Sequence, residues 1–114
     1  MIDYYRFGEF VIDGVSYQKD LILSKNQIVP NWIRLKAYLL SLSDIKKSVE
    51  ENRPEIVVVG TGKFGLMKVS TEVKNFLVKN NIYLHIKPTD KAVELFNSFL
   101  SKENNVLGFF HLTC

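Results

Sequence analysis

The sequence predicts one three-layer α/β domain with a mixed central sheet, spanning residues 1–114. Three observations support this prediction. Residues 55–60 form an apolar, mostly β-branched run that is typical of a buried strand. From there to the C-terminus, strand and helix patterns alternate as β-α-β-α-β. Residues 7–23 instead carry the pattern of an antiparallel hairpin unit.

The first predicted element is a β-hairpin closed by Asp13-Gly14. This dipeptide suits a type I′ turn, in which both central residues have positive φ. A two-residue loop pairs Ile12 with Val15 and Phe10 with Tyr17 on one face. Val11 and Ser16 then fall on the opposite face.

The next stretch is predicted as a strand over 20–23, which turns at 24–26, followed by a surface crossing over 28–33. Pro30 favours extended geometry in the residue before it and cannot donate to a sheet. We expect Trp32 to anchor this crossing on the core. Residues 34–40 fit either a strand or a helical turn, and both readings stay open.

Two helices are predicted on either side of the apolar strand at 55–60, which we expect to be the central one. Ser43 is the expected N-cap of the first helix, which ends at Arg53-Pro54. Ser70 is the expected N-cap of the second, over about 71–80, and Asn80-Asn81 supplies a left-handed stop.

The C-terminal third is predicted as strand 82–87, a helix capped by Thr89, and strand 106–112. Strand 82–87 has one polar face, so it is expected near an edge of the sheet. The helix carries apolar residues at helical spacing: Ala92, Leu95, Phe96, Phe99 and Leu100. Strands joined by crossover helices should be parallel.

The segment Gly60-Thr61-Gly62-Lys63-Phe64-Gly65 matches the GxGxxG dinucleotide motif in letters. Two observations weaken that match. The next helix starts only at Ser70, and the following strand ends in Ile86-Lys87 without an acidic residue for a ribose. The alternative to a dinucleotide site is that these glycines form a wide turn whose backbone needs positive φ. The P-loop pattern is absent.

Position makes this turn the best candidate ligand site, because ligands of open α/β sheets bind beyond the carboxyl ends of the strands. Residues 60–62 and 88–90 meet at that edge. Thr89 and Asp90 are also explained as cap and first-turn residues, and Asn97 as a structural hydrogen-bonding residue. The candidate binding residues for a small molecule or anion are Gly60, Thr61, Gly62, Lys63, Thr89, Asp90 and Asn97.

Composition narrows the function classes. The chain has one cysteine, so an internal disulfide is impossible, and His111 with Cys114 makes half a metal site at best. We therefore expect no metal and no cofactor, and no catalytic set is evident. The scattered lysines disfavour a nucleic-acid footprint despite the net charge of +3. No apolar run reaches the ~20 residues of a membrane helix, and no signal peptide is evident, so a cytoplasmic location is expected.

Several segments together resemble the Mth-type domain family of unknown function. They include Ile12-Asp13-Gly14, Asp20, Val29-Pro30-Asn31-Trp32, Val59-Gly60-Thr61-Gly62, Thr89 with Ala92, Phe96-Asn97 and the ending Phe110-His111-Leu112-Thr113-Cys114. The family includes the adipogenesis-associated Mth-type domain protein and mitochondrial complex I assembly factor 3. The ending is similar to that of archaeal and cytoplasmic single-domain members.

The resemblance implies a three-layer α/β fold with a hairpin subdomain, and a glycine turn unrelated to dinucleotide binding. It implies no established reaction, since members with a role act in assembly or interaction. The first hypothesis is a non-enzymatic cytoplasmic binding or assembly-helper protein with an unknown protein partner. The alternative is a small-molecule or anion-binding domain, or an enzyme, that uses the turn 60–65. An exposed sheet edge or the aromatic N-terminus would suit a homodimer.

Overall fold

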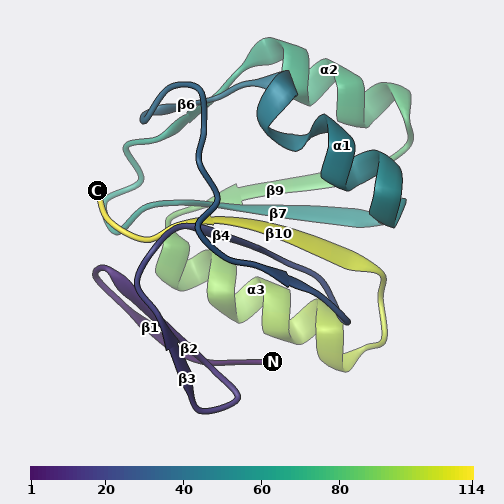
Figure 1. Ribbon diagram of the computed structural model, residues 1–114. Helices are drawn as coiled ribbons and strands as arrows, with labels where there is room; N and C mark the ends of the chain where they lie inside the picture. The colour runs from purple at the N-terminus through teal and green to yellow at the C-terminus, as the bar shows by residue number, and fades with distance from the viewer.

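The computed structural model describes residues 1–114 as a mixed sheet with helices on both faces and two smaller sheets beside it (Figure 1). Along the chain the elements are β1 (Ile2–Arg6), β2 (Glu9–Ile12), β3 (Val15–Tyr17), β4 (Leu21–Leu23), β5 (Ile28–Val29), β6 (Leu39–Leu40), α1 (Leu42–Asn52), β7 (Ile56–Thr61), β8 (Lys68–Val69), α2 (Thr71–Lys79), β9 (Tyr83–Lys87), α3 (Thr89–Ser101) and β10 (Val106–His111).

The main sheet has five strands in the order β5-β4-β10-β7-β9. β10, β7 and β9 are parallel, as predicted, whereas β4 and β5 run antiparallel to their neighbours. β7 is fully buried, but the prediction that it is the central strand is wrong. β4 pairs with β10 on the side opposite to β7, so the C-terminal strand β10 is the middle strand of the five.

The N-terminal hairpin has the predicted register, with Ile12 opposite Val15 and Phe10 opposite Tyr17. Asp13 and Gly14 both have positive φ, 49° and 80°, as a type I′ turn requires. The sequence did not predict β1, which pairs with β2 and completes a separate three-stranded sheet. Only Ile2 of β1 is buried, so its segment lacks a strong alternating pattern.

Helix α1 begins two residues earlier than predicted. Ser41, not Ser43, is the N-cap, and the capping box joins it to Asp44: the Ser41 amide donates to the Asp44 carboxylate at 2.7 Å. The position of Asp44 at N3 fixes the cap. Helix α2 follows its prediction, since Ser70 Oγ accepts from the Val73 amide and Asn81 has a φ of 59°.

Helix α3 starts at Thr89, and Pro88 is its N-cap. The prediction that Thr89 caps this helix is therefore wrong. Proline at this position makes no side-chain cap, and the Thr89 hydroxyl is engaged elsewhere.

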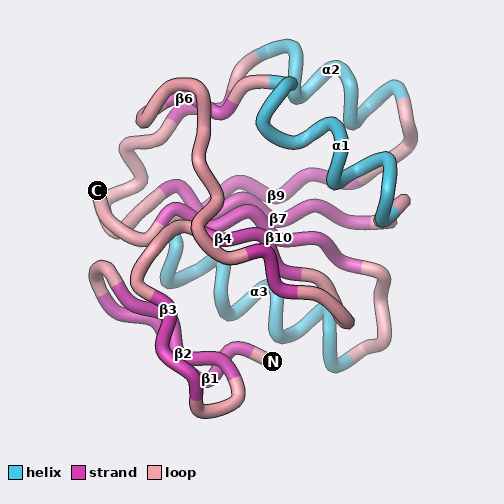
Figure 2. Tube along the Cα trace, viewed as in Figure 1, coloured by secondary structure: helices cyan, strands magenta, loops and turns pink.

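The crossing from β5 to β6 runs over the face of the sheet, as the loop colouring in Figure 2 shows. Trp32 anchors it as predicted, with its ring centroid 5.5 Å from that of Phe109. Within residues 34–40 the strand alternative holds only at the end: Leu39–Leu40 form β6, which pairs in parallel with β8, and Lys36 makes an isolated antiparallel bridge with Leu39. The other residues of this stretch are loop and turn.

Two apolar clusters fill the spaces between the layers. One lies under α1 and α2 and includes Val57, Val59 and Phe109. The other lies between the sheet, α3 and the hairpin sheet, where Phe10 and Phe96 pack against Phe110 at centroid distances of 5.0 and 5.6 Å. This packing on both faces holds the carboxyl ends of β7, β9 and β10 at one edge of the domain.

Candidate functional site

The carboxyl ends of β7 and β10 and the start of β4 meet at one edge of the sheet, near the C-terminus of the chain (Figure 1). β4 is antiparallel, so its first residues face the last residues of β10. Two loops rise from this edge, residues 30–38 before β6 and residues 62–67 before β8. The site that position predicts for an open α/β sheet lies here.

The glycine turn uses its amides inside the protein. Gly62 N–H donates to Thr89 Oγ1 at 2.8 Å, Lys63 N–H to the Thr113 carbonyl at 2.7 Å and Gly65 N–H to the Gly62 carbonyl at 3.2 Å. Gly62 has a φ of +98°, and a Cβ there would lie 2.6 Å from the Thr113 carbonyl oxygen. The C-terminal residues thus cover the face of the turn on which a dinucleotide motif would hold phosphate.

Three predicted residues, Gly60, Thr61 and Thr89, join the strands to one another. Thr89, with no exposed surface, donates from Oγ1 to the His111 carbonyl at 2.6 Å while accepting from Gly62. Thr61 Oγ1 donates to the Lys87 carbonyl at 3.1 Å. A Cβ on Gly60 would come within 2.9 Å of Thr89 Oγ1, so glycine permits this close approach. Their polar groups stabilise the edge of the sheet.

The remaining three predicted residues lie apart from one another. Lys63 is exposed, with its Nζ 5.9 Å from the centre of the Tyr5 ring. Asp90 is exposed and accepts from the Lys91 amide at 2.9 Å. Asn97 bonds both backbone groups of Ile2 at 2.9 Å, which ties β1 to α3. The ligand role of all seven residues stays a prediction.

The structure adds a cluster that sequence reasoning missed: Asp20, Arg34 and His111. Asp20 Oδ2 accepts from Arg34 Nη1 at 2.6 Å and contacts His111 Nδ1 at 2.8 Å, while Oδ1 accepts from the Leu112 amide at 2.8 Å. Arg34 Nη2 donates to the Ala37 carbonyl at 2.7 Å. The cluster fastens the loop before β6 to the end of the sheet.

A weak signal for this cluster is present in the sequence. Asp20 immediately precedes the apolar strand Leu21–Leu23, and His111 is a polar residue within a C-terminal run that is otherwise apolar. Such residues in buried strands need partners. Their partners, however, lie up to 91 residues away in the chain.

Electrostatics keep Asp20 ionised. Burial raises the pKa of its carboxyl group, but hydrogen bonds from His111, Arg34 and the Leu112 amide outweigh burial. The pKa of Asp20 consequently lies below its ordinary value of 3.8. The ionised Asp20 carboxylate holds both the guanidinium and the imidazole in fixed orientations.

Two nitrogens of the cluster have no hydrogen-bond partner although they are buried: His111 Nε2 and Arg34 Nε. His111 retains 6% of its surface, and the Arg34 side chain 5%. A cavity of about 420 Å³ adjoins the cluster. Asp20, Trp32 and His111 line it, together with polar side chains that include Gln18, Lys19 and Asn31.

A second cavity, of about 430 Å³, lies beside β8, whose residues Lys68 and Val69 line it. Thr61, Phe64 and Pro88 contribute to its wall. Its charged lining residues are all basic: Lys68, Lys74 and Lys87. This cavity therefore combines a residue of the predicted site with a positive field.

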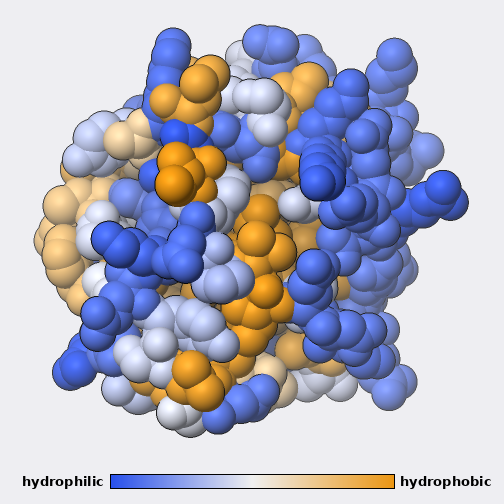
Figure 3. Space-filling view, in the orientation of Figure 1, coloured by the Kyte–Doolittle hydropathy of each residue, from blue (hydrophilic) through white to orange (hydrophobic).

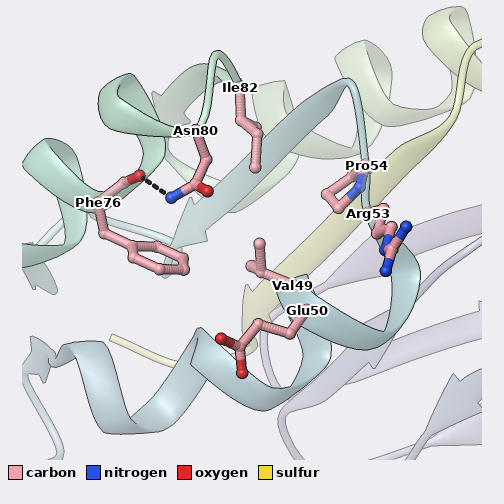
Figure 4. A pocket seen from close by; sticks show the side chains of 7 residues that line it. All are labelled: Val49, Glu50, Arg53, Pro54, Phe76, Asn80 and Ile82. Atoms are coloured by element: carbon pink, nitrogen blue, oxygen red, sulfur yellow. Dashed lines mark hydrogen bonds between the residues drawn. The ribbon is translucent and has the colours of Figure 1, made fainter.

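A third cavity, of about 490 Å³, lies at the opposite end of the sheet, between α1 and α2 (Figure 4). Pro54 and Ile82, which line it, precede β7 and β9 respectively. Figure 4 shows Glu50 and Arg53 at its wall, and Asn80 turned back to bond the Phe76 carbonyl at 2.7 Å. It faces the amino ends of the strands, away from the edge where open α/β sheets bind ligands.

Large apolar side chains are exposed on the two loops at the carboxyl edge. The loop surface, as we call it, consists of Ile33, Leu35, Tyr38, Phe64 and Leu66, which are 86%, 76%, 57%, 67% and 53% exposed. Figure 3 shows hydrophobic colour over the loop beside β6. Exposed apolar groups gathered in this way mark interaction sites more often than scattered single ones.

The cluster can orient an imidazole, but no serine, threonine or cysteine side chain bonds the His111 ring. No group of three or more His, Cys, Asp or Glu side chains converges as a metal site would require. The contacts that this edge offers are hydrogen bonds and apolar packing.

Comparison with known proteins identifies the family. A family described as a protein of unknown function, DUF498/DUF598, matches residues 2–111. The chain belongs to this family. The description of the family names no activity, and the resemblance to Mth-type domains expected from the sequence is confirmed.

Solved structures share the fold. A conserved hypothetical protein of Pyrococcus horikoshii has a TM-score of 0.86 at 24% identity, covering 100% of this chain and 99% of its own. An outer membrane protein of Bartonella henselae has a TM-score of 0.84 at 24% identity, covering 99% and 94%. A Mth938-like domain of Bordetella pertussis has a TM-score of 0.70 at 13% identity, covering 98% and 85%. At these identities the likeness establishes the fold alone.

None of the helices combines the length and the apolar character needed to cross a membrane.

Proposed function

We propose that this chain is a non-enzymatic protein-binding module that acts in the cytoplasm, and that it docks an acidic partner segment with apolar side chains on the loop surface. The observation that carries the proposal is the exposure of five large apolar side chains on two loops at one end of the sheet. Soluble monomers rarely leave such groups together without a partner. The single cysteine suits a reducing compartment.

The two loops are joined to each other and to α1 by hydrogen bonds from backbone amides. Lys68 N–H donates to the Tyr38 carbonyl at 2.8 Å, next to the β6–β8 pair. Leu35 N–H donates to Asp44 Oδ1 at 3.0 Å, which fixes the first loop to the start of α1. A surface held in place before binding loses little conformational entropy when the partner arrives.

Charge favours an acidic partner. No aspartate or glutamate occurs in residues 31–43 or 56–71. Lys36, Lys63 and Lys68 are exposed on these segments, whereas Arg34 is already paired with Asp20. An apolar segment flanked by carboxylates would match both the apolar side chains and the lysines.

The test is site-specific photocross-linking in a lysate of the source organism. A photoreactive residue replaces Leu35 in one variant and Val78 of α2 in the control. These two positions have matched exposures of 76% and 73%. We expect one protein to be cross-linked at position 35 and not at position 78, and the adduct to be lost when Lys36, Lys63 and Lys68 are changed to glutamate.

A second charge reversal serves as control for the first. Lys46→Glu and Lys47→Glu alter exposed lysines on α1 and should leave the adduct intact. Equal adducts at both positions would contradict the proposal. A second copy of this chain as the sole adduct, or binding to vesicles of anionic lipid in its place, would contradict it as well.

A second candidate function rests on the lysine-lined cavity beside Thr61. Three lysines and no carboxylate line it, so a small anion would find a positive field there. Of the predicted ligand residues, Thr61 lines this cavity, Lys63 lies in the adjoining turn, and both stay candidates for the anion site. Phosphate and citrate titrations followed by amide NMR test the candidate. Shifts confined to residues 61–74 and 86–88 and lost in Lys74→Ala would favour it, and shifts spread over all lysines would refute it.

A further inference from the structure

We propose that β9 pairs with β9 of a second copy of this chain. The two strands run antiparallel about a two-fold axis at His85, so that the two main sheets join into one. β9 is an end strand of the main sheet, whose order is β5-β4-β10-β7-β9 (Figure 1). The proposal is independent of the loop surface, which belongs to two other segments of the chain. It rests on the open edge of β9 and on the register that this edge permits.

The two edges of the main sheet differ in their protection against further strands. β5, at one end, has only the two residues Ile28–Val29, and Pro30 follows it immediately. Short edge strands and prolines keep a sheet from adding another strand. β9, at the other end, runs over the five residues Tyr83–Lys87, without a proline and with one lysine at its last position. The edge at β9 is therefore the one suited to pairing.

The backbone of β9 presents two residues to the outside. Tyr83 N–H donates to the Glu55 carbonyl at 3.1 Å, so the backbone groups of Tyr83 point toward β7 and its approach. The backbone groups of successive residues in a strand point to opposite sides. The amides and carbonyls of Leu84 and Ile86 consequently point outward, where water bonds them in a single copy. A second strand would replace that water along the whole edge.

Only one two-fold register uses all of these outward groups. With the axis at His85, Leu84 lies opposite Ile86 of the second copy, and each such pair exchanges both of its hydrogen bonds. With the axis at Ile86, Leu84 would meet Pro88, which has no amide hydrogen. With the axis at Leu84, Ile86 would meet Ile82, whose amide is already bonded within its own copy. The chain itself thus selects the register.

The side chains on the α2 face match in this register. Leu84 packs against the apolar cluster under α1 and α2 and is half-buried, while Ile86 is 36% exposed. Across the axis, each of these side chains would lie beside the other type from the second copy. Apolar cross-strand pairs stabilise a sheet, and here they would extend the cluster from one copy into the next.

The opposite face of β9 also complements itself. The His85 ring lies on Phe99 of α3, with ring centroids 5.2 Å apart, and would meet its counterpart at the axis. Tyr83, which is 73% exposed, would lie beside Lys87 of the second copy, where an ammonium group can contact the aromatic ring. The two lysines then lie at opposite ends of the joined strands, so they do not oppose each other. A second copy of β9 therefore suits this edge in both shape and charge.

Disulfide trapping tests the register, with Cys114→Ser in every variant because Cys114 is the one native cysteine. His85→Cys should give a disulfide-linked dimer on mild oxidation, since facing Cβ atoms at the axis lie about 4.5 Å apart. Tyr83→Cys alone and Lys87→Cys alone should give none, because each position lies about 13 Å along the strand from its counterpart. An equal mixture of these last two variants should give the mixed dimer.

The unaltered protein is tested by sedimentation equilibrium. Because the joint is small, we expect a dimer with a dissociation constant of about 10 µM. Ile86→Lys should raise this constant at least about tenfold, because it places a charge beside Leu84 of the second copy. Val15→Lys is the matched control and should leave the constant unchanged, since Val15 is 53% exposed on the edge strand β3 of the hairpin sheet. Circular dichroism checks that both variants are folded.

Three results would each overturn the proposal. One is an unaltered protein that stays monomeric at about 1 mM. The second is a dimer that Ile86→Lys leaves as tight as before. The third is trapping in Tyr83→Cys alone as efficient as in His85→Cys, which would mean that the copies meet without the predicted register.

Discussion

Replacing Thr89 by valine should destabilise the domain by about 3 kcal/mol, although the two side chains have nearly the same shape. The Thr89 hydroxyl is buried, accepts from the Gly62 amide at 2.8 Å and donates to the His111 carbonyl at 2.6 Å. Valine would leave both backbone groups without this partner. Each unsatisfied buried group costs about 1–3 kcal/mol, so the two groups together cost about 2–6 kcal/mol. The expected loss lies in the lower half of that range.

Urea unfolding of matched variants tests this reasoning. Thr89→Ser keeps the hydroxyl and loses one methyl group, for which the expected cost is about 1 kcal/mol. Thr71→Val alters an exposed threonine at the start of α2 and should be close to neutral. The slope of the urea dependence should stay unchanged while the midpoint falls. A smaller loss for Thr89→Val than for Thr89→Ser would refute the assigned hydrogen bonds.

Three further predictions follow from the same edge and its supports. Gly62→Ala should destabilise the domain by at least about 2 kcal/mol in thermal unfolding, because φ at Gly62 is +98° and the new Cβ would lie 2.6 Å from the Thr113 carbonyl oxygen. An unchanged melting temperature would contradict this prediction. Asn97→Ala should speed hydrogen exchange at the Ile2 amide by about tenfold, since Asn97 bonds both backbone groups of Ile2; exchange as slow as in the wild type would count against it. The folded-state pKa of Asp20 lies below 3.8, so the contribution of its carboxylate to the free energy of unfolding is complete above that pH and is lost as the pH falls through the lowered pKa. Asp20→Asn should therefore flatten the acid-side pH dependence of the free energy measured by urea unfolding. An unaltered pH dependence would contradict the account.

Local sequence signals predicted much of the fold. Asp13-Gly14 fixed the hairpin register because a two-residue turn leaves one pairing. Ser70 and Asn81 bounded α2 by ordinary capping chemistry. The parallel arrangement of β7, β9 and β10 followed from the helices between them. Each of these depends on residues close together in the chain.

The predictions failed where distant residues decide the outcome. The order of strands depends on β4, which joins β10 from the other half of the chain and makes β10 the middle strand. Thr89 looked like a cap because its position suits one, but its hydroxyl bonds Gly62 and His111. Ser41, and not Ser43, is the N-cap of α1, because Asp44 forms a capping box only with the residue three positions before it.

The sequence predicted where in the fold the candidate site lies, but it predicted only some of the residues that form the site. The carboxyl edge followed from the topology, and Gly60, Thr61, Gly62 and Thr89 do gather there. The contacts among Asp20, Arg34 and His111 escaped notice because they span 14 to 91 residues. The exposed loop surface also escaped, since an apolar residue in a loop looks in sequence like one that packs on the core.

Hydrogen exchange of the chain in complex with its cross-linked partner tests most directly the central claim that binding occurs at the carboxyl edge. The measurement compares each peptide in the free and the bound protein. We predict slower exchange over residues 31–38 and 62–67, and no change in α2 or at the cavity between α1 and α2. Protection confined to α2 and β9, with the two loops exchanging as in the free protein, would contradict it.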